Sequence, residues 1–336
     1  TNTLTYSTGT VTLETVNESK ADLATIASAG GAYADVKLAG ANITVSDSVN
    51  ATEAATIDAY HGGSGTVTLT TASGSASDLK TLHDDTTISI ATSLLTLSGS
   101  VSESVAATVN KYTNKAVTVS TISDSIANVK KIYDVKPTGA GKDGIDMSAA
   151  NITLSDSVTD ITALDNTLTY TTGTVTLETV SESKADLATI ASAGGAYADI
   201  KLAGANITVT GAINKTDADT IAAYHGGSGT LTIGEVTASA SDLKLLNDDS
   251  KIDISGATLN LSGAITDKAT VLTVLGYTSG TVKIATITED KTDLATLASA
   301  SGTYARASLS TANITVSDSV NATEAATIDG YGSGTV

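Results

Sequence analysis

Residues 65–69 read GTVTL, and the same five letters stand at residues 9–13 and 173–177, while residues 42–46 read NITVS and residues 151–155 read NITLS. A phrase that recurs at a nearly constant interval is typical of a solenoid, in which each repeat packs on its neighbours. The chain contains twelve complete versions, each with Val, Ile or Leu at two alternate positions. These pairs are Val11/Leu13, Ile43/Val45, Val67/Leu69, Leu95/Leu97, Val117/Val119, Ile152/Leu154, Val175/Leu177, Ile207/Val209, Leu231/Ile233, Leu259/Leu261, Val282/Ile284 and Ile314/Val316.

The phrases alternate between two kinds, A (GTVTL-like) and B (NITVS-like), and one A with one B occupies about 54 residues. A longer period is also present, because residues 2–45 match residues 166–209 at 41 of 44 positions, an offset of 164. Residues 41–58 recur unchanged at 312–329. We therefore predict a single continuous repeat array over residues 1–336, as a segment of a longer chain or polymer.

Each phrase predicts a strand, since apolar and hydroxyl residues alternate between Gly, Ser and Asn. A short helix is expected after each strand. Ten positions after the second inward residue of every A strand stands an apolar residue, and another follows three positions later, on the same side of a helix. Ser19, Ser75 and Ser239 each precede an Asp by three residues, as helix N-caps do. Asn50 and Asn321 precede a Glu in the same way.

Alternating strands and helices indicate parallel strands joined by right-handed crossovers. The predicted fold is an α/β solenoid with one main strand and one short helix per coil, in about twelve coils of two alternating kinds. The alternative is a parallel β-helix with helical corners. Some B coils are expected to carry a second, small strand before the main one, at residues 87–90 or 251–254.

The composition excludes several classes of protein. The net charge is −18, from 36 acidic against 18 basic residues, which argues against nucleic-acid binding. There is no Cys, Phe or Trp, so the core is thin and aliphatic and no disulfide holds it. The sequence contains no run of 18 apolar residues, so it predicts no membrane span.

No catalytic constellation is evident. His61 and His225 occupy one repeat slot, in Tyr-His-Gly-Gly-Ser-Gly loops, and we expect exposed loop residues there, because a catalytic base needs a partner and a cleft. The glycines of these loops are expected in turns with positive φ. Ser77-x-x-Lys80 and Ser241-x-x-Lys244 are expected on helix surfaces. We predict no enzyme and no catalytic, cofactor-binding or metal-binding residue.

Calcium is the one ligand ion that the sequence keeps open. Asp84-Asp85 and Asp248-Asp249 occupy the same repeat position, and Asp143 and Asp146 lie in a Gly-rich loop around Lys142. Calcium prefers several closely spaced oxygen ligands, but neither the 12-residue acidic loop nor the Gly-rich calcium nonapeptide is present. Solvated turn acids are the favoured interpretation, and we predict no cofactor.

The outward strand face carries threonine at ten of twelve central positions, with Asn260 and Lys283 as the exceptions. A regular threonine face suits ice binding, lateral packing or glycan contact, although threonine is also common on any exposed strand. The twelve central positions of the outward strand face are Thr12, Thr44, Thr68, Thr96, Thr118, Thr153, Thr176, Thr208, Thr232, Asn260, Lys283 and Thr315.

The tyrosines occupy fixed positions in the repeat, where we expect them to fill corners between helix and strand.

The phrases ITVSDSVNATEAATIDA (43–59) and SGTVTLTTASGSASDLKTL (64–82) resemble the repeats of very long, acidic, Thr/Ala/Asp-rich surface proteins of aquatic bacteria, including cyanobacteria. The likeness covers essentially the whole chain in rhythm and composition. It implies an extracellular or cell-surface stalk, adhesin or fibre.

The leading hypothesis is therefore a non-enzymatic structural protein, a segment of a stiff extracellular filament or surface stalk. The predicted partner is another copy or a further coil, joined end to end and, as a further option, side by side. The alternative is a binding module, adhesin-like, that uses the Thr-rich strand face for polysaccharide, ice or another surface.

Overall fold

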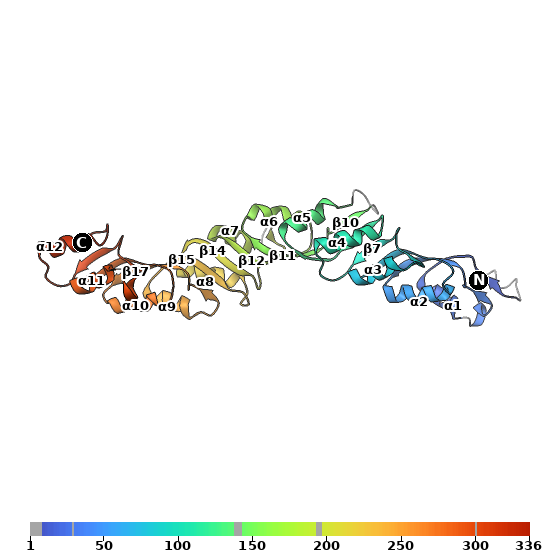
Figure 1. The fold of residues 1–336 in the computed structure, drawn as a ribbon, viewed down its shortest axis with the longest axis horizontal. Coiled ribbons are helices and arrows are strands. Elements are labelled where there is room, and N and C mark those ends of the chain that lie inside the picture. Colours follow the sequence, from blue (N-terminus) through green and yellow to red (C-terminus); the bar gives the residue numbers. More distant parts are fainter. Residues whose placement is uncertain (1–8, 29, 138–142, 193–196, 300) are drawn as a thin grey trace. The chain divides into compact units, whose positions relative to one another are not determined.

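The computed structural model describes residues 9–28, 30–137, 143–192, 197–299 and 301–336. The chain divides into two compact units, the first made of Thr1–Ser155 with Asp165–Val175 and the second of Asp156–Leu164 with Thr176–Val336. Each unit is an α/β solenoid of parallel strands and short helices, so the predicted fold class is confirmed (Figure 1).

The first unit and the stretch leading out of it alternate strands with helices in chain order. Strands are β1 (Val11–Thr12), β2 (Thr15–Glu18), β3 (Val36–Lys37), β4 (Asn42–Val49), β5 (Val67–Gly74), β6 (Ile88–Ser89), β7 (Leu94–Leu97), β8 (Ala116–Val119), β9 (Thr121–Asp124), β10 (Gly144–Asp146) and β11 (Asn151–Val158). Helices are α1 (Lys20–Ala27), α2 (Ala51–His61), α3 (Ala76–Asp84), α4 (Glu103–Val109), α5 (Ile126–Asp134) and α6 (Ile161–Leu168). Short 3-10 turns cover Gly31–Tyr33 and Asn110–Tyr112.

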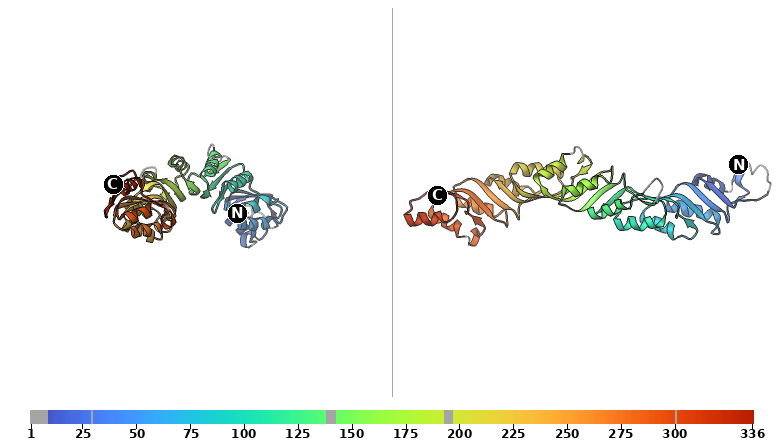
Figure 2. Two further views of the ribbon diagram at one scale, coloured as in Figure 1. Left: turned by 60° about the vertical axis from the view of Figure 1, so that its left-hand side comes forward. Right: turned by 90° about the horizontal axis from the view of Figure 1, so that it is seen from above.

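The second unit repeats the same order. Its strands are β12 (Val175–Ser183), β13 (Ile200–Lys201), β14 (Asn206–Ile213), β15 (Leu231–Ala238), β16 (Ile252–Asp253), β17 (Thr258–Ile265), β18 (Val282–Glu289), β19 (Ala307–Ser308) and β20 (Asn313–Val316). Its helices are α7 (Lys184–Ala191), α8 (Lys215–Tyr224), α9 (Ala240–Asp248), α10 (Lys268–Leu275), α11 (Lys291–Ala298) and α12 (Ala322–Asp329), with a 3-10 turn at Gly302–Tyr304. Successive helices pack side by side along the strands, for example α7 on α8 and α8 on α9 (Figure 2).

The core consists of the alternate apolar residues of the strands. Ten of the twelve predicted pairs are fully buried, while Val11, Leu13 and Val316 in the outermost phrases are half-buried. The predicted helix positions close the core from the other side, since Leu23, Leu79 and their four equivalents have no exposed surface. Burial of aliphatic side chains from the strands and from the helices in this shared core is the main contribution to stability.

Each A strand pairs with two strands of the next coil, which refines the expectation of one main strand per coil. The first half of β5 pairs with β6, with Val67 opposite Ile88, and the second half pairs with β7, with Ala72 opposite Leu95. In the second unit β15 pairs in the same way with β16 and β17. The predicted small strands are thus confirmed at 88–89 and 252–253.

A tight turn between the small and the main strand of the B coil produces this step. It is closed by a hydrogen bond from Ala41 N to Leu38 O at 2.9 Å and recurs between Ala205 N and Leu202 O at 2.9 Å. The turn moves the chain from the first half of the neighbouring A strand to its second half.

The step divides the predicted threonine column into short pieces. Thr44 lies opposite Thr68, and Thr68 then lies opposite Ser89 of the small strand. Thr96 instead continues from Ser73. The regular threonine face suggested by the sequence is therefore interrupted, because the sequence pattern does not reveal the change of register between A and B strands.

The predicted helix starts are confirmed. The side chains of Ser19, Ser75 and Ser239 accept the backbone N–H three residues on, and Asn50 and Asn321 form complete capping boxes with Glu53 and Glu324. Such caps satisfy backbone donors that a helix leaves free at its start. They matter here because helices of two to three turns are marginal on their own.

Glycines serve two purposes in the loops that lead into A strands. Gly62 and Gly63 have φ of 71° and 81°, as predicted for turns with positive φ. Gly65 is required for a different reason, because a Cβ there would lie 2.0 Å from Ala41 O of the preceding coil. The equivalent distance from Gly229 to Ala205 O is 1.8 Å. The glycine of the GTVTL phrase thus marks close contact between backbones.

Candidate functional site: the junctions between coils

Helix α1 is capped by a carboxylate that belongs to the next coil. The backbone N–H of Lys20, its first residue, donates to Asp47 Oδ1 on β4 at 2.9 Å. The first N–H groups of a helix have no partner within the helix, and a negative charge beside them also interacts favourably with the helix dipole. The start of one coil's helix is therefore completed by the strand that follows it.

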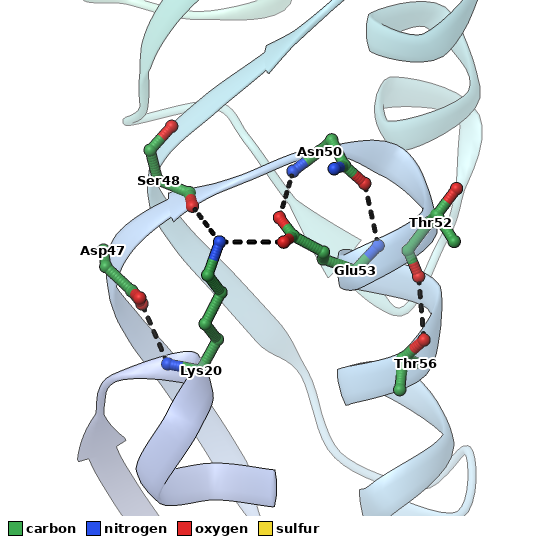
Figure 3. Close-up of polar contacts among 7 residues, drawn as sticks. All are labelled: Lys20, Asp47, Ser48, Asn50, Thr52, Glu53 and Thr56. Carbon is green, nitrogen blue, oxygen red and sulfur yellow. Dashed lines mark hydrogen bonds and ion pairs between the residues drawn. The ribbon is translucent and has the colours of Figure 1, made fainter.

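The Lys20 side chain strengthens the same junction (Figure 3). Its Nζ donates to Ser48 O at 3.2 Å and to Glu53 Oε1 at 2.8 Å. Glu53 Oε2 accepts the backbone N–H of Asn50 at 3.0 Å, and Asn50 Oδ1 accepts the N–H of Glu53 at 3.0 Å. One lysine thus joins the start of α1, the end of β4 and the capping box of α2.

The charges of this pair support each other. The hydrogen bond from Lys20 lowers the pKa of Glu53, with a further contribution from the Asn50 N–H, and the same hydrogen bond raises the pKa of Lys20. The side chains are 40% and 36% exposed, so water and salt screen their attraction. The backbone cap from Asp47 and the ladder carry more of the junction's stability than the ion pair does.

The second unit contains the same junction with the same atoms. Lys291 N donates to Asp318 Oδ1 at 3.0 Å, and Lys291 Nζ contacts Ser319 O at 3.3 Å and Glu324 Oε1 at 3.0 Å. A third copy keeps only part of it, since Lys184 Nζ reaches Asp217 Oδ2 at 3.0 Å but Gly211 stands where Asp47 does.

Two helices of B coils, α4 and α10, are capped by the next A strand in the same manner. Glu103 N at the start of α4 donates to Asp124 Oδ2 at 2.8 Å. Lys268 N at the start of α10 donates to Glu289 Oε1. Burial acts to raise the pKa of Asp124, but the hydrogen bonds from Glu103, Asn128 and Ser125 outweigh it, and the pKa is lowered. Carboxylates near the ends of strands are thus the common element of these junctions.

The sequence did not predict these caps between coils. A signal was nevertheless present, because the fourth residue after the first inward residue of the B strand is Asp47, Asp156 and Asp318 in three coils and Gly99, Gly211 and Gly263 in the other three. A slot that holds either an acid or glycine is unusual for an exposed strand end.

The two loop histidines are buried, which corrects the expectation of exposed residues. His61 and His225 are each 0% exposed. His61 Nδ1 accepts the N–H of Gly65 at 3.2 Å and His61 Nε2 lies 2.8 Å from Asp58 Oδ1. His225 Nδ1 accepts the N–H of Gly227 at 3.2 Å, but its Nε2 has no hydrogen-bond partner within the described part of the chain.

A polar residue that is buried or half-buried follows the tyrosine at several of these corners. Thr278, in the slot of His61, accepts the N–H of Gly280 at 2.8 Å and donates to Ala257 O. Thr171 makes the equivalent bonds to Gly173 N at 2.9 Å and Ala150 O at 2.6 Å. Because the His loops are two residues longer, the larger imidazole of His61 reaches the amide of Gly65, which is equivalent to the Gly280 amide that Thr278 reaches, whereas His225 bonds the earlier Gly227. The histidines therefore have a structural role.

The acids considered for calcium hold turns and helix surfaces. Asp85 Oδ1 accepts Thr87 N at 2.8 Å, and Asp146 Oδ1 accepts Ser148 N at 3.1 Å. Asp84 pairs with Lys80 and Asp248 with Lys244, one turn apart on the helices. Lys142 lies outside the described residues. Over the described ranges, no three His, Asp or Glu side chains gather closely enough to hold a metal ion.

The Ser-x-x-Lys pairs lie on helix surfaces, as predicted, with Ser77 Oγ 2.8 Å from Ser75 Oγ and Lys80 directed to Asp84. Tyrosines lie half-buried beside the helices. Tyr60 and Tyr331 line grooves between successive helices, and Tyr133 stacks on Tyr170 with ring centroids 4.1 Å apart. Tyr6 lies outside the described residues.

Comparison with protein-family models, with curated proteins and with solved structures found no match for this chain. No helix among the described residues is long and apolar enough to cross a membrane.

Proposed function

We propose that the chain is a non-enzymatic structural protein, a stiff segment of an extracellular filament or cell-surface stalk. The observation that carries this proposal is that coils complete one another, since the helix of one coil takes its N-terminal cap from the strand of the next, as Lys20 does from Asp47. Within each unit, the parallel strand pairing and the aliphatic core add to the same effect. Within a unit, a bend between coils would break all three interactions together, so each unit resists bending.

The stacking surface also supports addition of further coils. β20 pairs with β18, and in the described residues its other edge meets only the start of the next phrase, through Ile314 N to Thr335 O at 2.8 Å. β4 has the same NITV sequence and pairs with β2 on one edge and β5 on the other. We propose that copies associate end to end, with a strand edge of one copy pairing with an A strand of another as β4 pairs with β5.

Electron microscopy and force spectroscopy test the structural function. The expected result is elongated particles of constant width that resist stretching until coils unfold. Flexible or collapsed particles, with unfolding at forces typical of an unstructured linker, would contradict the proposal.

A binding role for the Thr face is the second candidate, supported by neighbouring threonines in register, such as Thr208 opposite Thr232. Replacing Thr68 and Thr208 by Lys tests it in glycan-binding and thermal-hysteresis assays. Loss of binding with unchanged unfolding would support this role. Absence of binding in the unaltered chain would exclude it.

A further inference from the structure

Glu182 differs from the other capping carboxylates because one of its oxygens is unsatisfied. The residue is 8% exposed, and Oε1 has no hydrogen-bond partner among the residues that the structure describes. The backbone N–H groups of Ser183 and Ile161 lie near the carboxylate and favour its charged form, so Glu182 on β12 stands beside the start of α6. A buried carboxylate oxygen without a donor is unfavourable when the group is ionised.

The charges around Glu182 add to this cost. Asp186 on α7 and Asp160 just before α6 are both close enough to repel it, whereas the neighbouring cation, Lys184, extends to Asp217 Oδ2 at 3.0 Å. Burial, followed by repulsion from Asp186 and Asp160, raises the pKa of Glu182, and the two backbone N–H groups oppose the shift only in part. The neutral carboxyl group is thus favoured in the folded chain.

Two equivalent junctions show what is missing here. At the start of α10, Lys268 donates its N–H to Glu289 and its ammonium group pairs with Asp293. Ile161 stands in the position of Lys268, and Asp186 in that of Asp293.

At the start of α4, Asn128 holds the position of Asp186, and its Nδ2 donates to Asp124 Oδ1 at 2.8 Å. The Glu182 junction therefore combines two neighbouring acids with neither the ammonium group nor the amide donor of its counterparts.

We propose that the start of α6 is a proton-operated junction, in which uptake of a proton by Glu182 in mild acid tightens the contact between α6 and β12 and loss of that proton loosens it. The proposal concerns the folding equilibrium of this chain alone and does not depend on its structural function. The folded chain binds this proton more tightly than the unfolded chain, so stability rises as the pH falls through the folded pKa. Asp124 has the opposite shift, and its contribution is lost on acidification.

The experiment is a nuclear magnetic resonance titration of the Glu182 carboxyl carbon, combined with amide exchange at Ile161. Glu182 is expected to titrate above the ordinary glutamate value of about 4.3. The protection factor of the Ile161 amide, corrected for intrinsic exchange, should rise several-fold as the pH falls through that titration, while that of Glu103, capped by Asp124, should fall. Titration of Glu182 at or below the ordinary value would overturn the proposal.

Two variants separate the proton from other effects of acid. Glu182→Gln should give high Ile161 protection at neutral pH and abolish its pH dependence. Ile161→Lys should supply the ammonium group found at α10, lower the pKa of Glu182 and raise protection at neutral pH. Glu289→Gln is the matched control and should bring no gain, because Lys268 already provides the charge.

An unchanged pH dependence in Glu182→Gln would overturn the proposal. If that variant does not fold, the wild-type titration and Ile161→Lys still decide, because an added ammonium group that leaves Ile161 protection unchanged would also contradict it.

Discussion

The junction around Lys20 and the junction around Lys184 are built from almost the same sequence and are not held equally. Residues 2–45 and 166–209 differ at only three of 44 positions. Just beyond this match, Asp47 is replaced by Gly211, so Lys20 N–H has a carboxylate at 2.9 Å, whereas the corresponding residue in the Lys184 copy is a glycine with φ of 88° and no side chain. Sequence identity within a coil thus fixes the coil, and single residues beyond it determine how firmly consecutive coils are joined.

The largest expected loss of stability comes from replacing a loop glycine that both copies share. Gly65→Ala and Gly229→Ala should each destabilise the chain by about 3 kcal/mol, because the new Cβ would overlap a carbonyl oxygen of the preceding coil. Chemical denaturation measures the loss. Gly256→Ala is the control, since a Cβ there meets nothing within 4 Å. Equal denaturation midpoints for Gly65→Ala and Gly256→Ala would show that the chain tolerates a Cβ at the close approach of Gly65 to the preceding coil.

The comparison itself is tested by removing the cap that only one copy has. Asp47→Ala should cost about 1 kcal/mol and increase amide exchange at Lys20 to the level of Lys184. Asp318→Ala should have the same effect at Lys291, which has the same partner. If Lys20 and Lys184 already exchange at equal rates in the unaltered chain, the cap contributes nothing. Gly211→Asp is not a useful reverse test, because φ of 88° is strained for Asp.

A smaller effect, this time an increase in stability, is expected from a substitution beside a buried histidine. Asp58 pairs with His61, and Ala222 occupies the corresponding place beside His225. Ala222→Asp should stabilise the chain by up to about 1 kcal/mol at neutral pH by giving the buried Nε2 a partner. Asp58→Ala should have the reverse effect at His61. A loss of thermal stability in Ala222→Asp would mean that the His225 ring cannot reach the new carboxylate.

The smallest effect is expected from the exposed ion pair. Glu53→Gln should change the unfolding midpoint less than Asp47→Ala does, and the difference should shrink in high salt. Because the pKa of Glu53 is lowered in the folded chain, its contribution is present above the unfolded value of about 4.3 and is lost as the pH falls through the folded one. Denaturation at pH 7 and pH 3 measures this, and a Glu53→Gln midpoint that differs more at pH 3 than at pH 7 would contradict it.

The fold could be predicted from the sequence because its decisive signals are local. Alternate burial of Val67 and Leu69, and capping of α3 by Ser75, depend on residues a few positions apart. The stepped register could not be predicted, because it depends on where the turn at Ala41 places the next strand.

The junctions lay beyond prediction for a related reason. Asp47 acts on a helix that starts 27 residues earlier, and the same carboxylate would be a solvated acid if the coils were stacked differently. The burial of His61 was also missed, although its slot is the one that Thr113 and Thr278 fill. Comparing the residue that follows each tyrosine with the length of the loop after it would have indicated that this position is buried.

The two-part pairing of the A strands has a mechanical consequence. Within each unit, the ends of the small strand and of the main strand of a B coil meet beside the middle of an A strand, as β6 and β7 do beside β5. Where the A strand is unbroken, as in β5, β12, β15 and β18, it spans the gap between the two strand ends beside it. Separating neighbouring coils at these places requires cutting covalent backbone or opening a full row of hydrogen bonds.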